Sequence, residues 1–154
     1  MKGIAKFLAR ERVKFLKASS KIEALNALVD LLAKSPAVED RESLRVAIFD
    51  REKILSTGIG LGIAVPHAKI RSVNSFVVAV GVLRASIEFK SLDRKPVNII
   101  VMIAGPEHQH EQYLRILART TLLLKNARNR RAILGAKTED DVFRLFTEGY
   151  QEGA

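Results

Sequence analysis

The sequence has 154 residues, of which 47% are hydrophobic, and 26 basic residues against 17 acidic ones give a net charge of +9. This length and apolar content predict one domain over residues 1–154. The absence of cysteine excludes disulfides, thiolate catalysis and cysteine–zinc sites. No apolar run approaches the roughly 20 residues that span a bilayer, and the N-terminus lacks the apolar core of a signal peptide. We therefore expect a cytoplasmic protein without direct membrane insertion.

Two helices are predicted in the first third of the chain. Within residues 19–36, apolar residues recur at helical spacing, Ser19 or Ser20 can cap the start, and Pro36 follows the end. Residues 38–54 form a second segment of this kind. Together these segments predict a pair of helices that precedes the strands.

Residues 75–83 and 96–105 differ from the preceding segments in being short and dense in β-branched residues. They predict buried strands. Shorter strand candidates lie at 62–67 (GIAVPH) and at 12–16 (RVKFL). The strands thus occupy mainly the middle of the sequence.

The helical period returns over about 107–125, among basic residues. Two shorter helices are expected after it, one around Arg130 and one over 138–148, where Thr138 and Asp141 make a capping box in its acidic form. Helices on either side of a central strand region predict an α/β fold with the sheet sandwiched by helices.

The segment STGIGLGIAVPHAKI, residues 56–70, joins a glycine-rich stretch to a histidine that follows a proline. A dinucleotide-binding fingerprint needs a strand before its glycines and a helix after them, and here that order is reversed. A P-loop needs Gly-Lys-Ser/Thr, whereas Gly62 is followed by Ile63. Both nucleotide loops are therefore excluded.

The string HQHEQYL offers a zinc alternative, because His110 and Glu111 begin an HExxH-like pattern. Leu114 stands where the second histidine should be, and His108 and His110 alone supply too few ligands. We expect no metal and no other cofactor.

His67 is the candidate for chemistry. One alternative is a histidine that packs at a strand end with its nitrogens hydrogen-bonded. Against this, Pro66 fixes the backbone just before the ring, and glycines such as Gly58 and Gly60 let backbone N–H groups approach a small anion. Near pH 7 a neutral imidazole is a good nucleophile.

Polar side chains around this segment suit a phosphoryl group. Ser56 and Thr57 carry hydroxyl donors, and Arg51 carries a planar guanidinium that matches phosphate geometry. Together with the imidazole, these groups describe a histidine that can be phosphorylated. Since the chain has neither a P-loop nor an evident magnesium carboxylate set, the phosphoryl group would come from another protein.

The stretch REKILSTGIGLGIAVPHAKI, residues 51–70, resembles the active-site signature of the IIA domains of fructose/mannitol type in the bacterial phosphoenolpyruvate-dependent sugar phosphotransferase system (PTS). It is most similar to the nitrogen-regulatory IIA branch. The resemblance covers nearly the whole chain, since the helix after Ser19, the SLDRKPVNIIVMIAGP segment and the final helices follow in the family's order.

This resemblance implies a mixed β-sheet flanked by helices and a phosphocarrier function. It matches His67 to the phosphorylated histidine, Arg51 to an arginine near it, and Thr57 with the glycine loop to a phosphate-facing turn. The donor would be the phosphohistidine of an HPr-type carrier. The acceptor or partner would be a IIB domain, through a cysteine, or a regulatory target protein.

The sequence departs from the family's pattern at one place. The family carries a second histidine at the start of the helix after the second long strand, and here Tyr113 or Gln112 is found there. His110 lies one turn earlier, with His108 before it. We therefore expect either His110 or Tyr113 to assist His67.

The predicted function is that of a phosphocarrier protein, which transfers a phosphoryl group between histidines and catalyses no turnover of a small molecule. A regulatory role in the nitrogen PTS is the main hypothesis, and the IIA component of a fructose/mannitol-type transporter is the alternative. Nucleic-acid binding through the basic KNARNRR cluster is not expected, because no aromatic residues are interleaved with its cations.

Overall fold

The computed structural model describes residues 2–148 of the chain. In this range the elements follow one another as α1 (Lys2–Ala5), β1 (Leu8–Leu16), α2 (Lys21–Leu32), α3 (Arg41–Ile54), β2 (Gly58–Gly60), β3 (Ile63–Ala64), β4 (His67–Ile70), β5 (Val77–Ile87), β6 (Val97–Pro106), α4 (His110–Lys125), α5 (Ala127–Gly135) and α6 (Glu139–Thr147).

The strands form one mixed sheet in the order β1-β5-β6-β3-β2, and β4 also pairs with β6. Strands β5 and β6 are antiparallel, whereas β1 runs parallel to β5, and both β3 and β4 run parallel to β6. Because β3 pairs with β6 at Ile99 and β4 pairs with it from Ile103 onward, the two short strands follow each other along one edge of β6. The predicted α/β class and the mixed sheet are confirmed.

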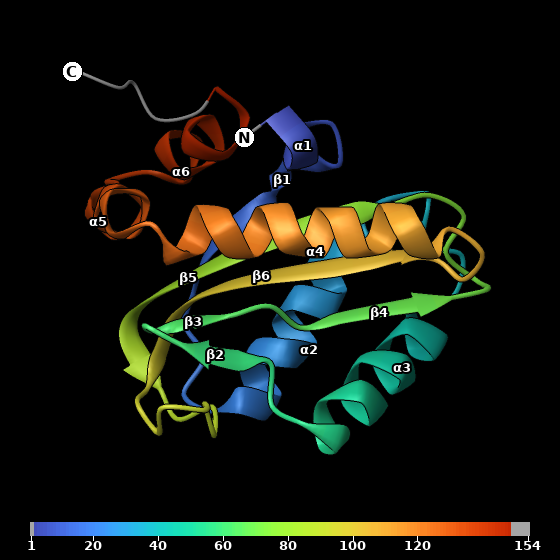
Figure 1. The fold of residues 1–154 in the computed structure, drawn as a ribbon, viewed down its shortest axis with the longest axis horizontal. Coiled ribbons are helices and arrows are strands. Elements are labelled where there is room, and N and C mark those ends of the chain that lie inside the picture. The colour runs from blue at the N-terminus through green and yellow to red at the C-terminus, as the bar shows by residue number, and fades with distance from the viewer. Residues whose placement is uncertain (1, 149–154) are drawn as a thin grey trace.

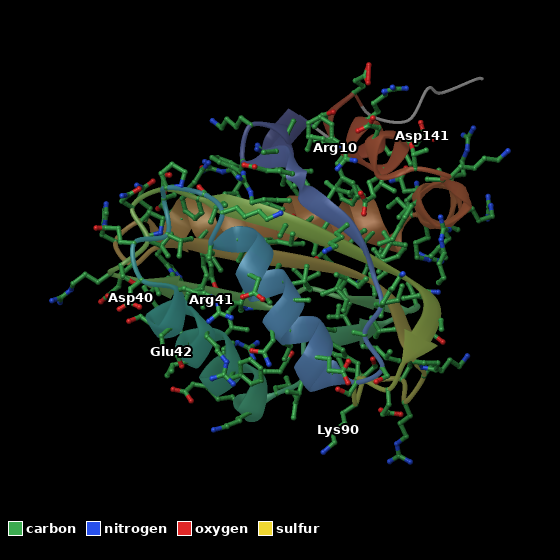
Figure 2. The ribbon with its side chains drawn as sticks, turned by 180° about the vertical axis from the view of Figure 1, so that it is seen from behind. Arg10, Asp40, Arg41, Glu42, Lys90 and Asp141 are labelled. Carbon is green, nitrogen blue, oxygen red and sulfur yellow. The ribbon has the colours of Figure 1, made fainter. Side chains whose placement is uncertain are left out.

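Helices cover both faces of this sheet (Figure 1). Helices α2 and α3 pack on one face with one apolar cluster, as seen from behind in Figure 2. Helices α1, α4, α5 and α6 pack on the opposite face with a second cluster. Since the central strands β5 and β6 are covered on both sides, they are apolar almost without interruption rather than alternating.

The helix boundaries follow from capping residues that are visible in the sequence. Ser20, one of the two candidates, caps α2 by accepting a hydrogen bond from the amide of Glu23 (3.2 Å). Asp40 caps α3, so this helix begins three residues later than the pattern predicted. Thr138 caps α6 as expected. The three caps each satisfy an N–H group that the helix itself leaves without a partner.

The strand predictions differ from the structure at the glycine-rich segment. Residues 58–64 form a hairpin, β2 and β3, in which Gly60, Leu61 and Gly62 have positive φ angles. The candidate strand 62–67 is divided, because Pro66 has no N–H for ladder pairing, and β4 begins only at His67. Strand β1 is longer than predicted, and helix α1 was not predicted.

Helix α6 lies against the edge strand β1. Arg10 forms ion pairs with Glu139 and Asp140, and the amide of Phe15 donates to Glu139 Oε2 at 2.8 Å. A strand edge exposes unpaired backbone groups, and this carboxylate satisfies one of them.

Strand β1 and helix α2 pack closely against β5 at Gly81. A Cβ atom on Gly81 would lie 2.5 Å from Leu16 Cδ1 and 3.2 Å from Leu28 Cδ2. Gly81→Ala should therefore lower the free energy of unfolding in urea by about 1–3 kcal/mol through overpacking. The control is Gly135→Ala at the end of α5, where a Cβ meets nothing within 4 Å. Equal stability of the two variants would contradict this packing.

Candidate functional site

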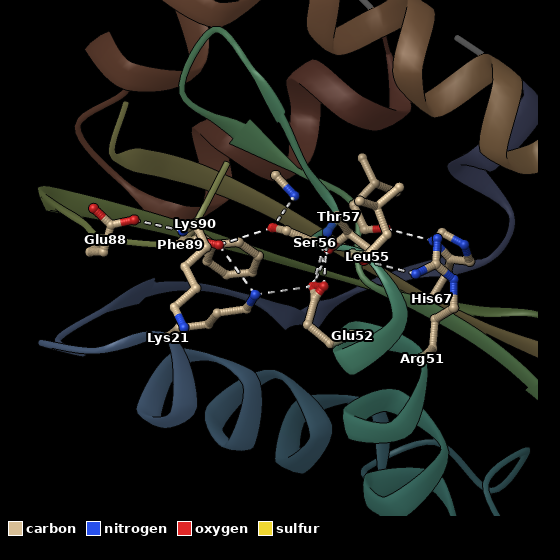
Figure 3. Close-up of polar contacts among 12 residues, drawn as sticks. Lys21, Arg51, Glu52, Leu55, Ser56, Thr57, His67, Glu88, Phe89 and Lys90 are labelled. Atoms are coloured by element: carbon tan, nitrogen blue, oxygen red, sulfur yellow. Dashed lines mark hydrogen bonds and ion pairs between the residues drawn. The ribbon is translucent and has the colours of Figure 1, made fainter. Parts of the chain in front are cut away.

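Three elements meet around His67. The histidine opens the edge strand β4, Arg51 lies in the last turn of α3, and Tyr113 lies in the first turns of α4. Figure 3 shows the Arg51 guanidinium beside the His67 ring. The ring of Tyr113 meets that of His67 edge-on, with 5.8 Å between ring centroids. The site is thus assembled from both helical layers at one edge of the sheet.

The His67 ring is held in one tautomer. Its Nδ1 lies 2.7 Å from the carbonyl oxygen of Val65. Because a carbonyl only accepts, Nδ1 carries the hydrogen, and the neutral ring has its free lone pair on Nε2. Nε2 is therefore the nucleophilic atom of this histidine.

The surroundings keep this ring neutral. Burial lowers the pKa of His67 below its usual value of 6.5, and the positive charge of Arg51 lowers it further, against the opposing effects of the Val65 hydrogen bond and the Glu52 carboxylate. The ring is half-buried. At neutral pH the unprotonated form, which carries the nucleophilic lone pair, therefore predominates.

Arg51 is positioned by its own helix end. Its Nη1 donates to the carbonyl oxygen of Leu55 at 2.9 Å. No pairing of Arg51 with Asp50 or Glu52 is found among the described residues, where Asp50 pairs with Lys53 instead. The guanidinium has further N–H groups to offer an anion at His67.

Tyr113 is the aromatic neighbour of His67. Its side chain is buried, and this burial raises the pKa of its hydroxyl well above the usual value, against a lowering effect of Arg51. The hydroxyl is therefore neutral at physiological pH. Of the two residues expected to assist His67, Tyr113 is the one in contact with its ring.

His110 is turned to a different partner. Its Nδ1 accepts a hydrogen bond from the ammonium of Lys69, two residues after His67 on β4. His110 and His108 are both exposed. Lys69 was not among the predicted site residues, although its place two positions after His67 puts it on the same side of the strand.

The hydroxyls of Ser56 and Thr57 have structural partners. Ser56 Oγ donates to the carbonyl of Phe89 at 2.9 Å. The amide and the hydroxyl of Thr57 both donate to the buried carboxylate of Glu52, at 2.8 and 2.5 Å to its nearer oxygens. The ammonium of Lys21 lies 3.9 Å from the same carboxylate (Figure 3). These contacts fix the chain that follows Arg51.

The glycines have close structural neighbours. A Cβ on Gly58 would collide with Ser91, and its amide donates to Ser56 Oγ. Gly60 faces the Asp93 carboxylate, which accepts the amide of Leu61. Gly58 and Gly60 therefore pack closely against the loop before β6, and this packing positions the hairpin.

Within residues 2–148, no three His, Asp or Glu side chains gather in a way that could hold a metal ion. None of the helices in this described part combines the length and the hydropathy needed to cross a membrane.

Comparison with known proteins identifies the family. Residues 6–149 match the model of the phosphoenolpyruvate-dependent sugar phosphotransferase system, EIIA 2. The fructose-specific EIIABC component of Bacillus subtilis is 32% identical over 94% of this chain, which spans only 23% of that relative. The nitrogen regulatory protein of Pseudomonas aeruginosa is 30% identical over 84% of each chain.

Solved structures agree in fold. The nitrogen regulatory protein IIA-Ntr of Neisseria meningitidis superposes with a TM-score of 0.86 at 24% identity, covering 94% of this chain and 99% of that one. The mannitol IIA enzyme of Escherichia coli, in a complex with phosphorylated mannitol IIB, gives a TM-score of 0.76 at 22% identity, covering 91% and 96%. The chain belongs to the EIIA 2 family of the phosphoenolpyruvate-dependent sugar phosphotransferase system, whose members are phosphocarriers.

Proposed function

We propose that this phosphocarrier accepts a phosphoryl group on Nε2 of His67 from the phosphohistidine of an HPr-type carrier. The observation that carries the proposal is the 2.7 Å contact of His67 Nδ1 with the Val65 carbonyl, which leaves the free lone pair on Nε2 of a ring that lies beside Arg51. The lowered pKa of His67 supports it, because the ring is unprotonated at neutral pH.

The transfer balances without a cofactor. The lone pair of Nε2 attacks phosphorus, and the bond between phosphorus and the donor's ring nitrogen breaks. The donor ring leaves as neutral imidazole if its other nitrogen carries a proton. His67 becomes a phosphoimidazolium whose Nδ1–H still donates to the Val65 carbonyl. Since a hydrogen bond from a charged donor is stronger, this contact stabilises the product ring.

Arg51 and Tyr113 supply charge and orientation. The guanidinium compensates the charge on the phosphoryl oxygens, and a fixed charge of this kind in a partly buried site stabilises the transition state effectively. The Tyr113 ring packs edge-on against the imidazole and limits its rotation. Tyr113 thereby takes the assisting role that the sequence left open between it and His110.

Once His67 is phosphorylated, the phosphoryl group can serve in one of two roles. Similarity to the nitrogen regulatory protein over 84% of both chains supports a regulatory role, in which phosphorylation changes binding to a target protein. Similarity to the fructose-specific EIIABC component supports the alternative, transfer to a cysteine of a separate IIB domain. We place regulation first, as the sequence comparison with the nitrogen branch suggests.

Intact mass measurement tests phosphorylation at His67. After incubation with phosphoenolpyruvate, enzyme I and HPr, the chain should gain the mass of one phosphoryl group, labile in acid and stable in base. His67→Ala should gain none, because it has no nucleophile, and the control His108→Ala should behave as the parent does. An equal gain by His67→Ala would refute the assignment.

The effect of the Arg51 charge on the pKa of His67 should be measurable by titration. In an NMR titration, the pKa of His67 should lie below 6.5. The phosphorylation rate should fall as the pH drops through this midpoint, because the protonated ring has no free lone pair to attack phosphorus. Arg51→Gln should raise the midpoint, because a positive neighbour is lost, while Arg51→Lys keeps the charge. An unchanged midpoint in Arg51→Gln would mean that Arg51 does not act on the ring.

Transfer of the phosphoryl group from His67 to a IIB domain distinguishes the transporter role from the regulatory role. The phosphorylated chain is mixed with a fructose-type or mannitol-type IIB domain, and the mass of each protein is followed over time. Within the regulatory role, the phosphoryl group should stay on His67 for as long as it does in the absence of IIB. Rapid appearance of a phosphorylated IIB cysteine would instead establish the transporter role.

A further inference from the structure

Lys69 shares the exposed side of β4 with His67. Side chains alternate along a strand, and residues two apart lie roughly 7 Å from each other on one face. Ala68, between them, packs into the apolar cluster under α2 and α3. His67 and Lys69 therefore both face the layer of α4, where Tyr113 and His110 lie.

One aromatic ring connects the two side chains. The Lys69 ammonium lies 5.6 Å from the centroid of the Tyr113 ring, and the same ring meets His67 edge-on at 5.8 Å. A cation on an aromatic face is weakly held there. The Tyr113 ring is thus a shared neighbour of the Lys69 ammonium and the His67 imidazole.

The charge of Lys69 is uncompensated. Among the described residues Lys69 forms no ion pair with a carboxylate, and its ammonium donates instead to Nδ1 of His110, which as an acceptor carries no proton. Arg51, the other cation near His67, likewise donates to a neutral carbonyl. Two cations at one edge of the sheet, both satisfied only by neutral acceptors, indicate a site arranged for an anion.

We propose that Lys69 is a second cationic ligand of the phosphoryl group, and that His110 holds its ammonium while His67 is unphosphorylated. This inference rests on the proposed phosphorylation of His67. A phosphoryl group carries nearly two negative charges, and a charge-assisted hydrogen bond to it is stronger than one to a neutral imidazole. On phosphorylation the flexible Lys69 side chain leaves His110 and donates to the phosphoryl oxygens.

Two donors test this role. Phospho-HPr delivers the group through a protein interface, whereas phosphoramidate, a small molecule, phosphorylates histidine directly and releases ammonia. Lys69→Met should slow phosphorylation by both donors about tenfold, since a hydrogen bond to a charged group is lost. Lys69→Arg keeps the charge and should recover most of the rate. Lys53→Met is the control for net charge, because Lys53 is exposed and pairs with Asp50.

Each outcome of this comparison is decisive. Slowing with phospho-HPr alone would mean that Lys69 contacts the carrier, and parental rates with both donors would mean that it has no role; either result overturns the proposal. If the parent chain gains no phosphoryl group from either donor, or His67→Ala gains one, the proposed function fails instead. The two failures are thus distinguishable.

A second measurement uses the unaltered chain and so does not depend on folding of a variant. The ¹⁵N chemical shift of His110 Nδ1 reports whether this atom accepts a hydrogen bond. Phosphorylation of His67 should shift it toward the value of a free acceptor, and His110→Ala should leave the phosphoprotein's hydrolysis rate within about twofold of the parent's. An unmoved Nδ1 signal would show that Lys69 stays on His110.

Discussion

The site depends on one constraint, the fixed direction of the Val65 carbonyl. The amide of Val65 donates to Thr57 (3.0 Å), and the carbonyl of Pro66 accepts from the amide of Ile103 (3.0 Å). Between these two bonds the proline ring limits rotation of the backbone. The Val65 carbonyl is left outside the ladder and accepts the Nδ1–H of His67. The sheet therefore determines which ring nitrogen is nucleophilic.

A buried carboxylate on α3, the helix that carries Arg51, holds the residue just before β2. Glu52 accepts the amide and the hydroxyl of Thr57, and Lys21 on α2 approaches the same carboxylate. A buried charge is tolerated only when it is paired and hydrogen-bonded, as it is here. Since Glu52 adjoins Arg51 in α3, the contacts that satisfy Glu52 also anchor the end of the helix that carries Arg51.

Part of the high positive charge has a structural use. Arg12 donates to the carbonyls of Val78 and Phe7, and Arg130, from the basic KNARNRR cluster, donates to the last carbonyls of α4. Helix ends leave such carbonyls without intrahelical partners, and cations stabilise them. These arginines therefore stabilise the ends of secondary-structure elements.

The sequence by itself determined the α/β class and the capped helices, and it singled out His67 as the candidate nucleophile, because helical periodicity, capping residues and the PH dipeptide at His67 are local signals. It did not predict the packing roles of Gly58 and Gly60, and it missed Glu52 and Lys69. Those roles depend on partners distant along the chain, such as Asp93 for the hairpin and His110 for Lys69. Only the pairing of β4 with β6, and the packing of α3 and α4 at its edge, decided which side chains surround His67, since contacts of long sequence separation leave no periodic pattern in the sequence.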